Sequence, residues 1–293
     1  MNDGTSSSTT PNVLVVIGVG GMGAAIARRV GPAHAIVLAD RDEELLAATE
    51  ASMRDEGYRV STSVVDVADR ASVRAVVEKA SSIGQIAGVV HTAGVSPMQA
   101  SPARIIAVDL VGTAYVIDEF ACAIGENGAG VVIASMAGTL LGAGLGEEAE
   151  RLLATAPAEE LSQIPAVSAL LQSHGDDASA RSMAYAIAKR ANQLRVCEAS
   201  IAWGERGARL NSISPGIIST PMGRSEIGDS DSGELMKGMI GSSPVKRIGT
   251  PADVAGVVEF LLGPCASYIT GTDVLVDGGV VAAMKAGRVA IGT

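Results

Sequence analysis

Short apolar runs, rich in β-branched residues, alternate along this chain with longer segments that are apolar on one helical face. Between two of the runs, for example, "RDEELLAATEASMRDEG" has the spacing of an amphipathic helix. Strands that alternate with helices predict right-handed crossovers and a doubly wound parallel sheet, so we expect an α/β fold. The runs predict seven strands, at residues 13–18, 35–40, 58–67, 86–94, 129–138, 208–216 and 272–279.

Two segments depart from this alternation. Residues 139–182 are rich in acids and have apolar residues at helical spacing, which predicts two or three short helices inserted before the next long helix. This insertion is a surface elaboration, a lid or an oligomer contact. Residues 1–11 are polar and lack the features of a signal peptide, so we expect a disordered tail there and one domain over residues 12–293.

The composition argues against several classes of function. Of the 293 residues 47% are hydrophobic but only 2% aromatic, which suits an aliphatic core of buried strands. The net charge of −10, without a basic patch, argues against a nucleic-acid partner, and no apolar run is long enough to span a membrane. The three cysteines have no metal-ligand spacing, so we expect no metal site and a reducing, cytoplasmic location, with small core residues at Cys122, Cys197 and Cys265.

A glycine-rich turn, "GVGGMG" (18–23), follows the first predicted strand and opens the first helix. Glycines at Gly18, Gly20 and Gly23 let the backbone approach a pyrophosphate at the helix N-terminus, as in a Rossmann-type dinucleotide site. Asp40 ends the second strand, where a carboxylate binds the adenosine ribose and repels a 2′-phosphate, so the pattern favours NAD as the cofactor.

Other residues at the same edge of the sheet are candidates for cofactor contact because ligands bind beyond the carboxyl ends of such strands. Arg41 follows Asp40 and could meet a 2′-phosphate, but the carboxylate would occupy that space first. Asp66 and Val67 border the adenine or form an ordinary polar strand end. The remaining candidates are Gly21, Met22, Thr92, Ala93 and Gly94.

Tyr185 and Lys189 lie four positions apart in "RSMAYAIAKRAN", and therefore on one face of a helix. That spacing alone is weak evidence, but Ser135 ends the fifth predicted strand and brings all three to the cofactor edge. Hydride transfer from a secondary alcohol requires loss of the hydroxyl proton, which a tyrosinate can accept. A neighbouring ammonium favours the charged phenolate, and a serine hydroxyl can donate to the substrate oxygen.

In the order of these motifs the chain resembles the short-chain dehydrogenase/reductase family. Besides the glycine-rich turn and YxxxK, it has "HTAG" (91–94) where the family usually has Asn-Asn-Ala-Gly. The resemblance covers residues 12–284 and implies that Ser135, Tyr185 and Lys189 are the catalytic residues. It also implies that "SPGIISTPM" (214–222) binds the nicotinamide carboxamide, Ile218 by its backbone and Thr220 by its hydroxyl, beside Pro215 and Gly216.

Two features depart from the family pattern. The glycine-rich turn is one residue shorter than usual, so the pyrophosphate loop differs in detail. Asp109, in "VDLVG", stands where the family usually has an asparagine that supports a proton relay from the lysine. An aspartate can accept a hydrogen bond from Lys189 but cannot donate an amide hydrogen. We therefore count Asp109 with the catalytic residues and expect it to shift the pH optimum.

A closer resemblance is to bacterial 3α-hydroxysteroid dehydrogenase/carbonyl reductases. Ser135 and Tyr185 are 50 residues apart, and "AWGERGARLNSISPG" (202–216) and "VDGGVVAAMK" (276–285) are similar to that group. The resemblance implies NAD(H), a hydroxysteroid or xenobiotic carbonyl substrate, and a homo-oligomer. It further implies that the insertion replaces the usual tetramer contact and leaves a dimer.

Residues 221–245 are predicted to form a loop and short helix over the substrate. Methionines re-pack around varied shapes, so Met222, Met236 and Met239, with Ile240, predict an adaptable apolar wall, unless the methionines only pack against the domain. Met136 and Val95 are further candidates for the pocket lining. The loop has no cluster of arginine or lysine that would call for an acidic substrate, so a neutral, apolar alcohol or ketone fits best. The alternatives are the same chemistry on a small non-steroid alcohol, or an NAD-binding scaffold without turnover.

Overall fold

The computed structural model describes residues 10–98, 100–142, 144–173, 176–228 and 231–288. They form one seven-stranded parallel sheet in the order β3-β2-β1-β4-β5-β6-β7, which confirms the predicted α/β fold. The strands are β1 (Asn12–Ile17), β2 (Ala35–Asp40), β3 (Arg59–Val64), β4 (Gln85–His91), β5 (Ile124–Ile133), β6 (Arg209–Pro215) and β7 (Asp273–Val276).

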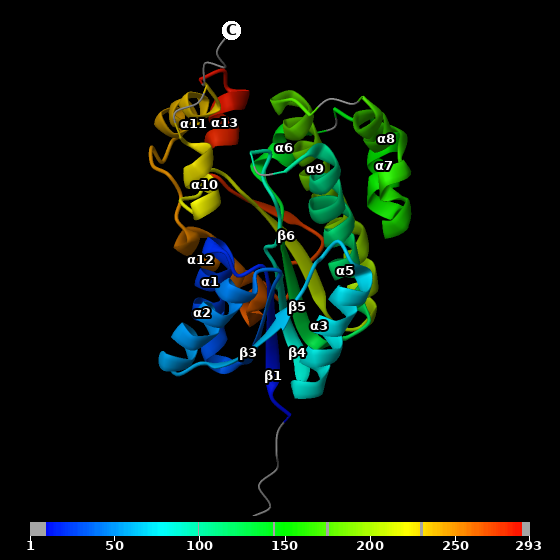
Figure 1. Cartoon of the computed structure of the whole chain (residues 1–293), viewed down its shortest axis with the longest axis vertical. Helices are drawn as coiled ribbons and strands as arrows, with labels where there is room; N and C mark the ends of the chain where they lie inside the picture. The colour runs from blue at the N-terminus through cyan, green and yellow to red at the C-terminus, as the bar shows by residue number, and fades with distance from the viewer. Residues whose placement is uncertain (1–9, 99, 143, 174–175, 229–230, 289–293) are drawn as a thin grey trace, which may run out of the picture.

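Helices cover both faces of the sheet (Figure 1). One face carries α1 (Gly21–Val30), α2 (Glu43–Asp55) and α12 (Pro251–Leu262), and the other α3 (Arg70–Ile83), α5 (Thr113–Ala121) and α9 (Ala178–Glu205). Alternate residues of β1 enter the two cores: Val13 and Val15 enter one, and Leu14 and Val16 the other. A strand buried on both faces must be apolar throughout, which is why the parallel strands are continuous apolar runs.

The fifth strand differs from the predicted range of 129–138. It begins at Ile124 and ends at Ile133, because Ser135 caps the short helix α6 (Met136–Leu141) with its side chain. The Ser135 hydroxyl accepts a hydrogen bond from the backbone N–H of Ala137 at 3.2 Å. The chain therefore leaves the sheet just before the candidate catalytic serine.

The insertion forms helices, as predicted: α7 (Glu147–Thr155), the 3₁₀ helix η3 (Ala158–Gln163) and α8 (Pro165–Gln172). In Figure 1 α7 and α8 lie outside α9, as a second layer over the helix that carries Tyr185. Their apolar residues, such as Leu153 and Val167, share a core with Ala188 of α9. Glu150 also accepts two hydrogen bonds from Arg190, at 2.8 and 2.9 Å.

The remaining elements lie mostly around the carboxyl edge of the sheet. A short helix, α4 (Pro102–Ile105), continues as the π-helical segment η2 (Ile106–Gly112) into α5. Helices α10 (Pro221–Glu226), α11 (Asp231–Ser242) and α13 (Val280–Lys285) lie beyond the strand ends, across from α6 in Figure 1. Two 3₁₀ turns complete the set, η1 (Gly31–Ala33) and η4 (Pro264–Ala266).

The prediction that the cysteines are core residues is wrong, because Cys122, Cys197 and Cys265 are all exposed. They lie at the end of α5, on the outer side of α9 and in η4, where apolar burial is already provided by neighbouring Ala, Val and Leu residues. The predicted tail falls almost wholly outside the described residues. Among those that are described, no helix is long and apolar enough to cross a membrane.

Candidate active site

The glycine-rich turn is packed closely against the end of β4. Gly18 has φ of +91°, a left-handed conformation that favours glycine, and a Cβ there would lie 2.4 Å from the backbone nitrogen of Ala93. A Cβ on Gly23 would lie 1.8 Å from the Gly18 carbonyl oxygen, which also accepts a hydrogen bond from the Thr92 hydroxyl at 2.6 Å. Both glycines are therefore required by the turn itself.

Gly20 has a different role because nothing lies within 4 Å of the position that its Cβ would take. It is the N-cap of α1, and its missing side chain leaves the first turn of that helix open to a ligand. Helix N-termini bind phosphate through unpaired N–H groups and the helix dipole. This open cradle fits the pyrophosphate of a nicotinamide dinucleotide.

Asp40 ends β2 beside the turn. One carboxylate oxygen accepts a hydrogen bond from the Val19 N–H at 2.7 Å, and the other from the Asp42 N–H at 3.1 Å. Arg41 is exposed beside it. The predicted carboxylate is thus held at the cofactor edge by the glycine-rich turn.

Asp66 and Val67 lie differently from the other candidates. Both oxygens of Asp66 lie 3.3 Å from the Arg104 guanidinium, and Val67 packs in the core with its backbone against Gly112. Of the two interpretations left open by the sequence, these contacts favour an ordinary strand end for Val67, whereas Asp66 stays a candidate.

A pocket of about 510 Å³ opens beyond the carboxyl ends of β4, β5 and β6. Most of the predicted site residues line it: Met22, Thr92, Gly94, Val95, Asp109, Ser135, Met136, Tyr185, Lys189, Pro215, Gly216, Ile218, Thr220, Met222 and Met236. The predicted residues outside this lining are Gly18, Gly20, Gly21, Gly23, Asp40, Arg41, Asp66, Val67 and Ala93.

Several lining residues were not predicted. Pro97 and Met98 follow β4, Leu140 belongs to α6, and Ala178, Arg181 and Ser182 come from the first turns of α9. A signal for the last three was present in the sequence, since they precede Tyr185 by seven, four and three residues and so share its helical face. The methionines of residues 221–245 lie in two different places. Met222 and Met236 line the pocket, whereas Met239 packs with Val280 and Ala283 of α13.

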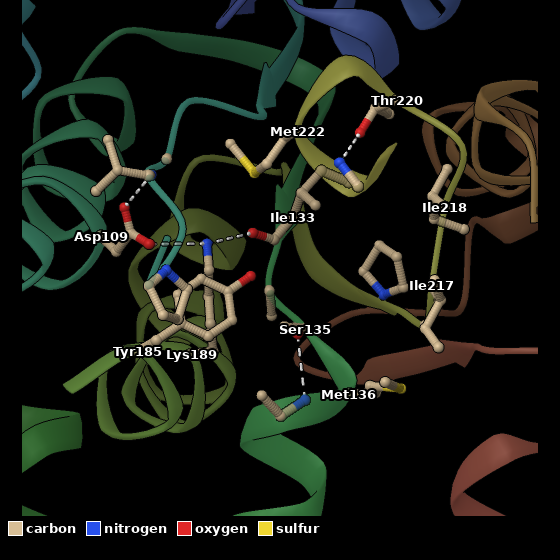
Figure 2. A pocket seen from close by; sticks show the side chains of 18 of the residues that line it. Asp109, Ile133, Ser135, Met136, Tyr185, Lys189, Ile217, Ile218, Thr220 and Met222 are labelled. Carbon is tan, nitrogen blue, oxygen red and sulfur yellow. Dashed lines mark hydrogen bonds and ion pairs between the residues drawn. The ribbon is translucent and has the colours of Figure 1, made fainter. Parts of the chain in front are cut away.

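Helix α9 carries the central pair of side chains. The Lys189 ammonium is almost fully buried, lies 5.4 Å from the centre of the Tyr185 ring and donates to the Ile133 carbonyl at 3.4 Å. Figure 2 shows Tyr185, from α9, and Ser135, from the turn between β5 and α6, reaching the same space. The three predicted catalytic residues are therefore brought together at one pocket.

Asp109 lies behind this pair, in the π-helical segment, and is completely buried. One carboxylate oxygen accepts a hydrogen bond from the Val95 N–H at 2.8 Å, and the other forms an ion pair with Lys189 at 3.7 Å (Figure 2). Burial raises the pKa of the Asp109 carboxyl above its ordinary value, and the nearby ammonium opposes that rise. Its backbone oxygen accepts from the Asn192 amide at 3.0 Å.

His91 is packed and hydrogen-bonded. Its Nε2 lies 3.0 Å from the Thr113 hydroxyl, which itself donates to the Asp109 carbonyl, so Nε2 is the donor in the neutral ring. Burial, and after it the Lys189 charge, lowers the pKa of His91 to about 3. His91 thus stays neutral over the working range of pH and is not an acid or base there.

Two family models together match most of the chain. The model described as short chain dehydrogenase matches residues 11–146, and the one described as Enoyl-(Acyl carrier protein) reductase matches residues 155–281. The chain belongs to the short-chain dehydrogenase/reductase family. The protein is accordingly an oxidoreductase of alcohols and carbonyls that uses a nicotinamide cofactor.

Individual relatives support this assignment along the whole domain. The chain is 41% identical over 271 residues to the short-chain dehydrogenase/reductase bsc3 of Alternaria brassicicola, covering 92% of this chain and 96% of the relative. It is 32% identical over 200 residues to the 3-alpha-hydroxysteroid dehydrogenase/carbonyl reductase of Comamonas testosteroni, covering 68% and 74% respectively.

A solved structure shares the fold. The 3-alpha-hydroxysteroid dehydrogenase from Pseudomonas sp. B-0831, complexed with NADH, has a TM-score of 0.74 and 28% identity, with 94% of this chain and 99% of that chain covered. These similarities confirm the predicted family and its hydroxysteroid dehydrogenase relatives.

Proposed function

We propose that this protein is an NAD-dependent dehydrogenase/reductase that interconverts secondary alcohols and ketones with Tyr185 as the acid/base. The observation that carries the proposal is that Tyr185, Lys189 and Ser135 line one pocket at the carboxyl edge of the sheet. That edge also carries the open first turn of α1. The proposed catalytic residues and the proposed dinucleotide site therefore lie at the same edge of the sheet.

Each of the three residues has a distinct task in the proposed mechanism. When bound, a nicotinamide cofactor would supply or accept the hydride. In alcohol oxidation the Tyr185 phenolate takes the hydroxyl proton, and in ketone reduction the phenol returns it to the carbonyl oxygen. The buried Lys189 ammonium, 5.4 Å from the ring, favours the phenolate. Ser135 donates a hydrogen bond to the substrate oxygen as its charge develops.

NAD is the cofactor that Asp40 favours. Its carboxylate lies at the end of β2 and is tied to the glycine-rich turn through Val19, where it would meet the adenosine ribose and repel a 2′-phosphate. The similar Pseudomonas dehydrogenase, which was solved with NADH, agrees with this choice. The backbone of Ile218 and the hydroxyl of Thr220 are proposed to hold the nicotinamide end.

The substrate proposed is an apolar ketone or alcohol, and a 3α-hydroxysteroid or a xenobiotic carbonyl is the first class to test. Methionines Met98, Met136, Met222 and Met236 line the pocket and adapt to bulky apolar bodies. The similar Comamonas enzyme is a 3-alpha-hydroxysteroid dehydrogenase/carbonyl reductase by name. A small non-steroid alcohol is the alternative within the same chemistry.

The test follows reduced-nicotinamide absorbance with NAD or NADP and a panel of hydroxysteroids and smaller secondary alcohols. Wild type is expected to turn over with NAD, and Tyr185→Phe to bind the cofactor without turnover. Cofactor binding without turnover in wild type, across the whole panel, would favour a non-catalytic scaffold.

We also propose that the protein is a dimer, in which α7 and α8 replace the usual tetramer contact. Light scattering with size exclusion tests this proposal.

A further inference from the structure

The substrate side of the pocket has two polar side chains besides the proposed catalytic set. Arg181 and Ser182 lie in the first two turns of α9 and line the pocket with Met98, Leu140 and Met236. Among the described lining residues three carry charge, and two of these, Asp109 and Lys189, neutralise each other at 3.7 Å. Arg181 is therefore the cation that a substrate can reach.

The position of Arg181 relative to Tyr185 is fixed by the helix. The two residues are four positions apart, which is about one turn, or ~6 Å along the helix axis. Lys189, Tyr185 and Arg181 thus follow one another along the pocket side of α9. A substrate whose carbonyl lies at Tyr185 extends toward Arg181 when its body lies along the helix.

The guanidinium is held in place but retains donors for a ligand. Its Nε donates to the Asp176 carboxylate at 2.7 Å, and its side chain is 33% exposed. No described residue accepts from its two terminal nitrogens, and the Ser182 hydroxyl likewise has no partner within the described ranges. A guanidinium that presents two parallel N–H groups matches the geometry of a carboxylate.

We propose that Arg181, assisted by Ser182, binds a carboxylate at the far end of the substrate, so that the preferred substrates are oxo acids and hydroxy acids with an apolar body between the two groups. The inference rests on the proposed alcohol/ketone chemistry and names the substrate class within it. It also revises the expectation of a wholly neutral substrate, because that expectation considered only the cations of the loop at 221–245.

The first experiment compares matched substrates. Methyl ketones of increasing chain length are assayed beside the same ketones with a terminal carboxylate, in wild type, Arg181→Leu and Arg181→Lys. A hydrogen-bonded ion pair of this kind changes kcat/KM by roughly tenfold to a hundredfold. Arg181→Leu is expected to lose that factor on the oxo acids and much less on the neutral ketones, and Arg181→Lys to recover part of it.

Two further variants sharpen the comparison. Asp176→Asn removes the competing carboxylate and is expected to raise kcat/KM for oxo acids about threefold or more, a change opposite in direction to that of Arg181→Leu. Arg151→Leu removes an exposed arginine that is paired with Glu148 on α7, outside the pocket, and is expected to change neither substrate class. Equal losses on ketones and oxo acids in Arg181→Leu, or a wild-type preference for the neutral ketones, would overturn the inference.

A binding measurement separates this inference from the proposed reaction. Alkanoates without a carbonyl are titrated into the enzyme–NAD complex by calorimetry, and wild type is expected to bind at least tenfold more tightly than Arg181→Leu. If wild type turns over neutral ketones but binds alkanoates no more tightly than Arg181→Leu, the carboxylate site is contradicted and the proposed reaction is not. Tighter alkanoate binding by wild type without turnover of any ketone supports the site and contradicts the proposed reaction.

Discussion

The Asp109 carboxylate lies 3.7 Å from the Lys189 ammonium, and the side chains of both residues are almost fully buried. A buried cation that has a buried carboxylate beside it exerts a weaker field on its other neighbours. The other neighbour here is Tyr185, whose ring centre lies 5.4 Å from the same ammonium. The pair therefore sets how strongly Lys189 favours the tyrosine phenolate.

Replacing Asp109 by asparagine is expected to extend alcohol oxidation to lower pH. The neutral amide keeps an acceptor for the Val95 N–H but leaves the Lys189 charge uncompensated, which favours the phenolate further. The acidic limb of the pH–rate profile is expected to move down by about half a unit or more. Stopped-flow measurement of nicotinamide reduction across pH checks this.

The matched control is Asp118→Asn. Asp118 is also a carboxyl whose pKa burial raises, and it faces Arg195 at 3.8 Å, but it lies on α5 away from the active-site pocket. The pH–rate profile of Asp118→Asn is expected to coincide with that of wild type. An unchanged profile in Asp109→Asn would show that the buried pair does not tune the acid/base.

His91 makes the fold sensitive to acid. Its pKa is lowered to about 3 in the folded protein from an ordinary value of 6.5. Below pH 6.5 the unfolded chain binds a proton that the folded protein excludes, so this contribution to stability is present above pH 6.5 and is lost as the pH falls toward 3. From pH 7 to 5 the loss is about 2 kcal/mol.

The variant His91→Asn is expected to remove this loss, since the amide can still bond to Thr113 and does not titrate. Urea denaturation at pH 7 and pH 5 measures the difference. His34→Asn is the control, because His34 is partly exposed and its ring nitrogen bonds to the Val30 carbonyl at the surface end of α1 rather than at the buried core. Equal pH dependence of stability in His91→Asn and wild type would contradict the prediction.

The glycine-rich turn allows folding and cofactor binding to be separated. An alanine at Gly23 would place its Cβ 1.8 Å from the Gly18 oxygen, so Gly23→Ala is expected to destabilise the fold by about 2 kcal/mol or more. Gly20→Ala has open space at this position and is expected to fold normally while binding NAD more weakly, since the backbone must approach the pyrophosphate.

Thermal denaturation and calorimetric titration with NAD measure the two effects. Gly204→Ala is the control. Gly204 lies near the end of α9, and nothing lies within 4 Å of the position that a Cβ would take, so the variant is expected to have nearly the stability and the NAD affinity of wild type. Normal NAD affinity in Gly20→Ala would show that the first turn of α1 is not the pyrophosphate site.

Much of this architecture follows from the pattern of apolar residues. Strands buried on both faces must be continuous apolar runs, so runs such as "VLVVI" predict strands correctly. Strand ends are less well predicted, because side-chain capping decides them: Ser135 starts α6 and so ends β5 early. The cysteines show the same limit, since hydrophobic character alone does not decide which face of α9 Cys197 occupies.

Some residues of the site can be predicted from the sequence and others cannot. Glycines, Asp40, Tyr185 and Lys189 are predictable because their chemistry requires fixed places on a strand–turn–helix unit. The family resemblance implies that Asp109 can accept a hydrogen bond from Lys189, but the burial of both side chains is seen only in the structure. Arg181 and Ser182 were missed because the insertion before them obscures where α9 begins, and the helical face of Tyr185 extends to them only once that start is known.

Cofactor choice is expected to depend on the charge of Asp40. Asp40→Asn keeps an acceptor for the Val19 N–H but no longer repels a 2′-phosphate, so the ratio of kcat/KM for NAD over NADP should fall at least about tenfold, or ~1.4 kcal/mol. Adding Arg41→Ala should reverse part of the gain with NADP, because the exposed guanidinium is then lost. Asp42→Asn, which keeps the cap on α2, serves as the control. An unchanged ratio in Asp40→Asn would mean that another residue selects the cofactor.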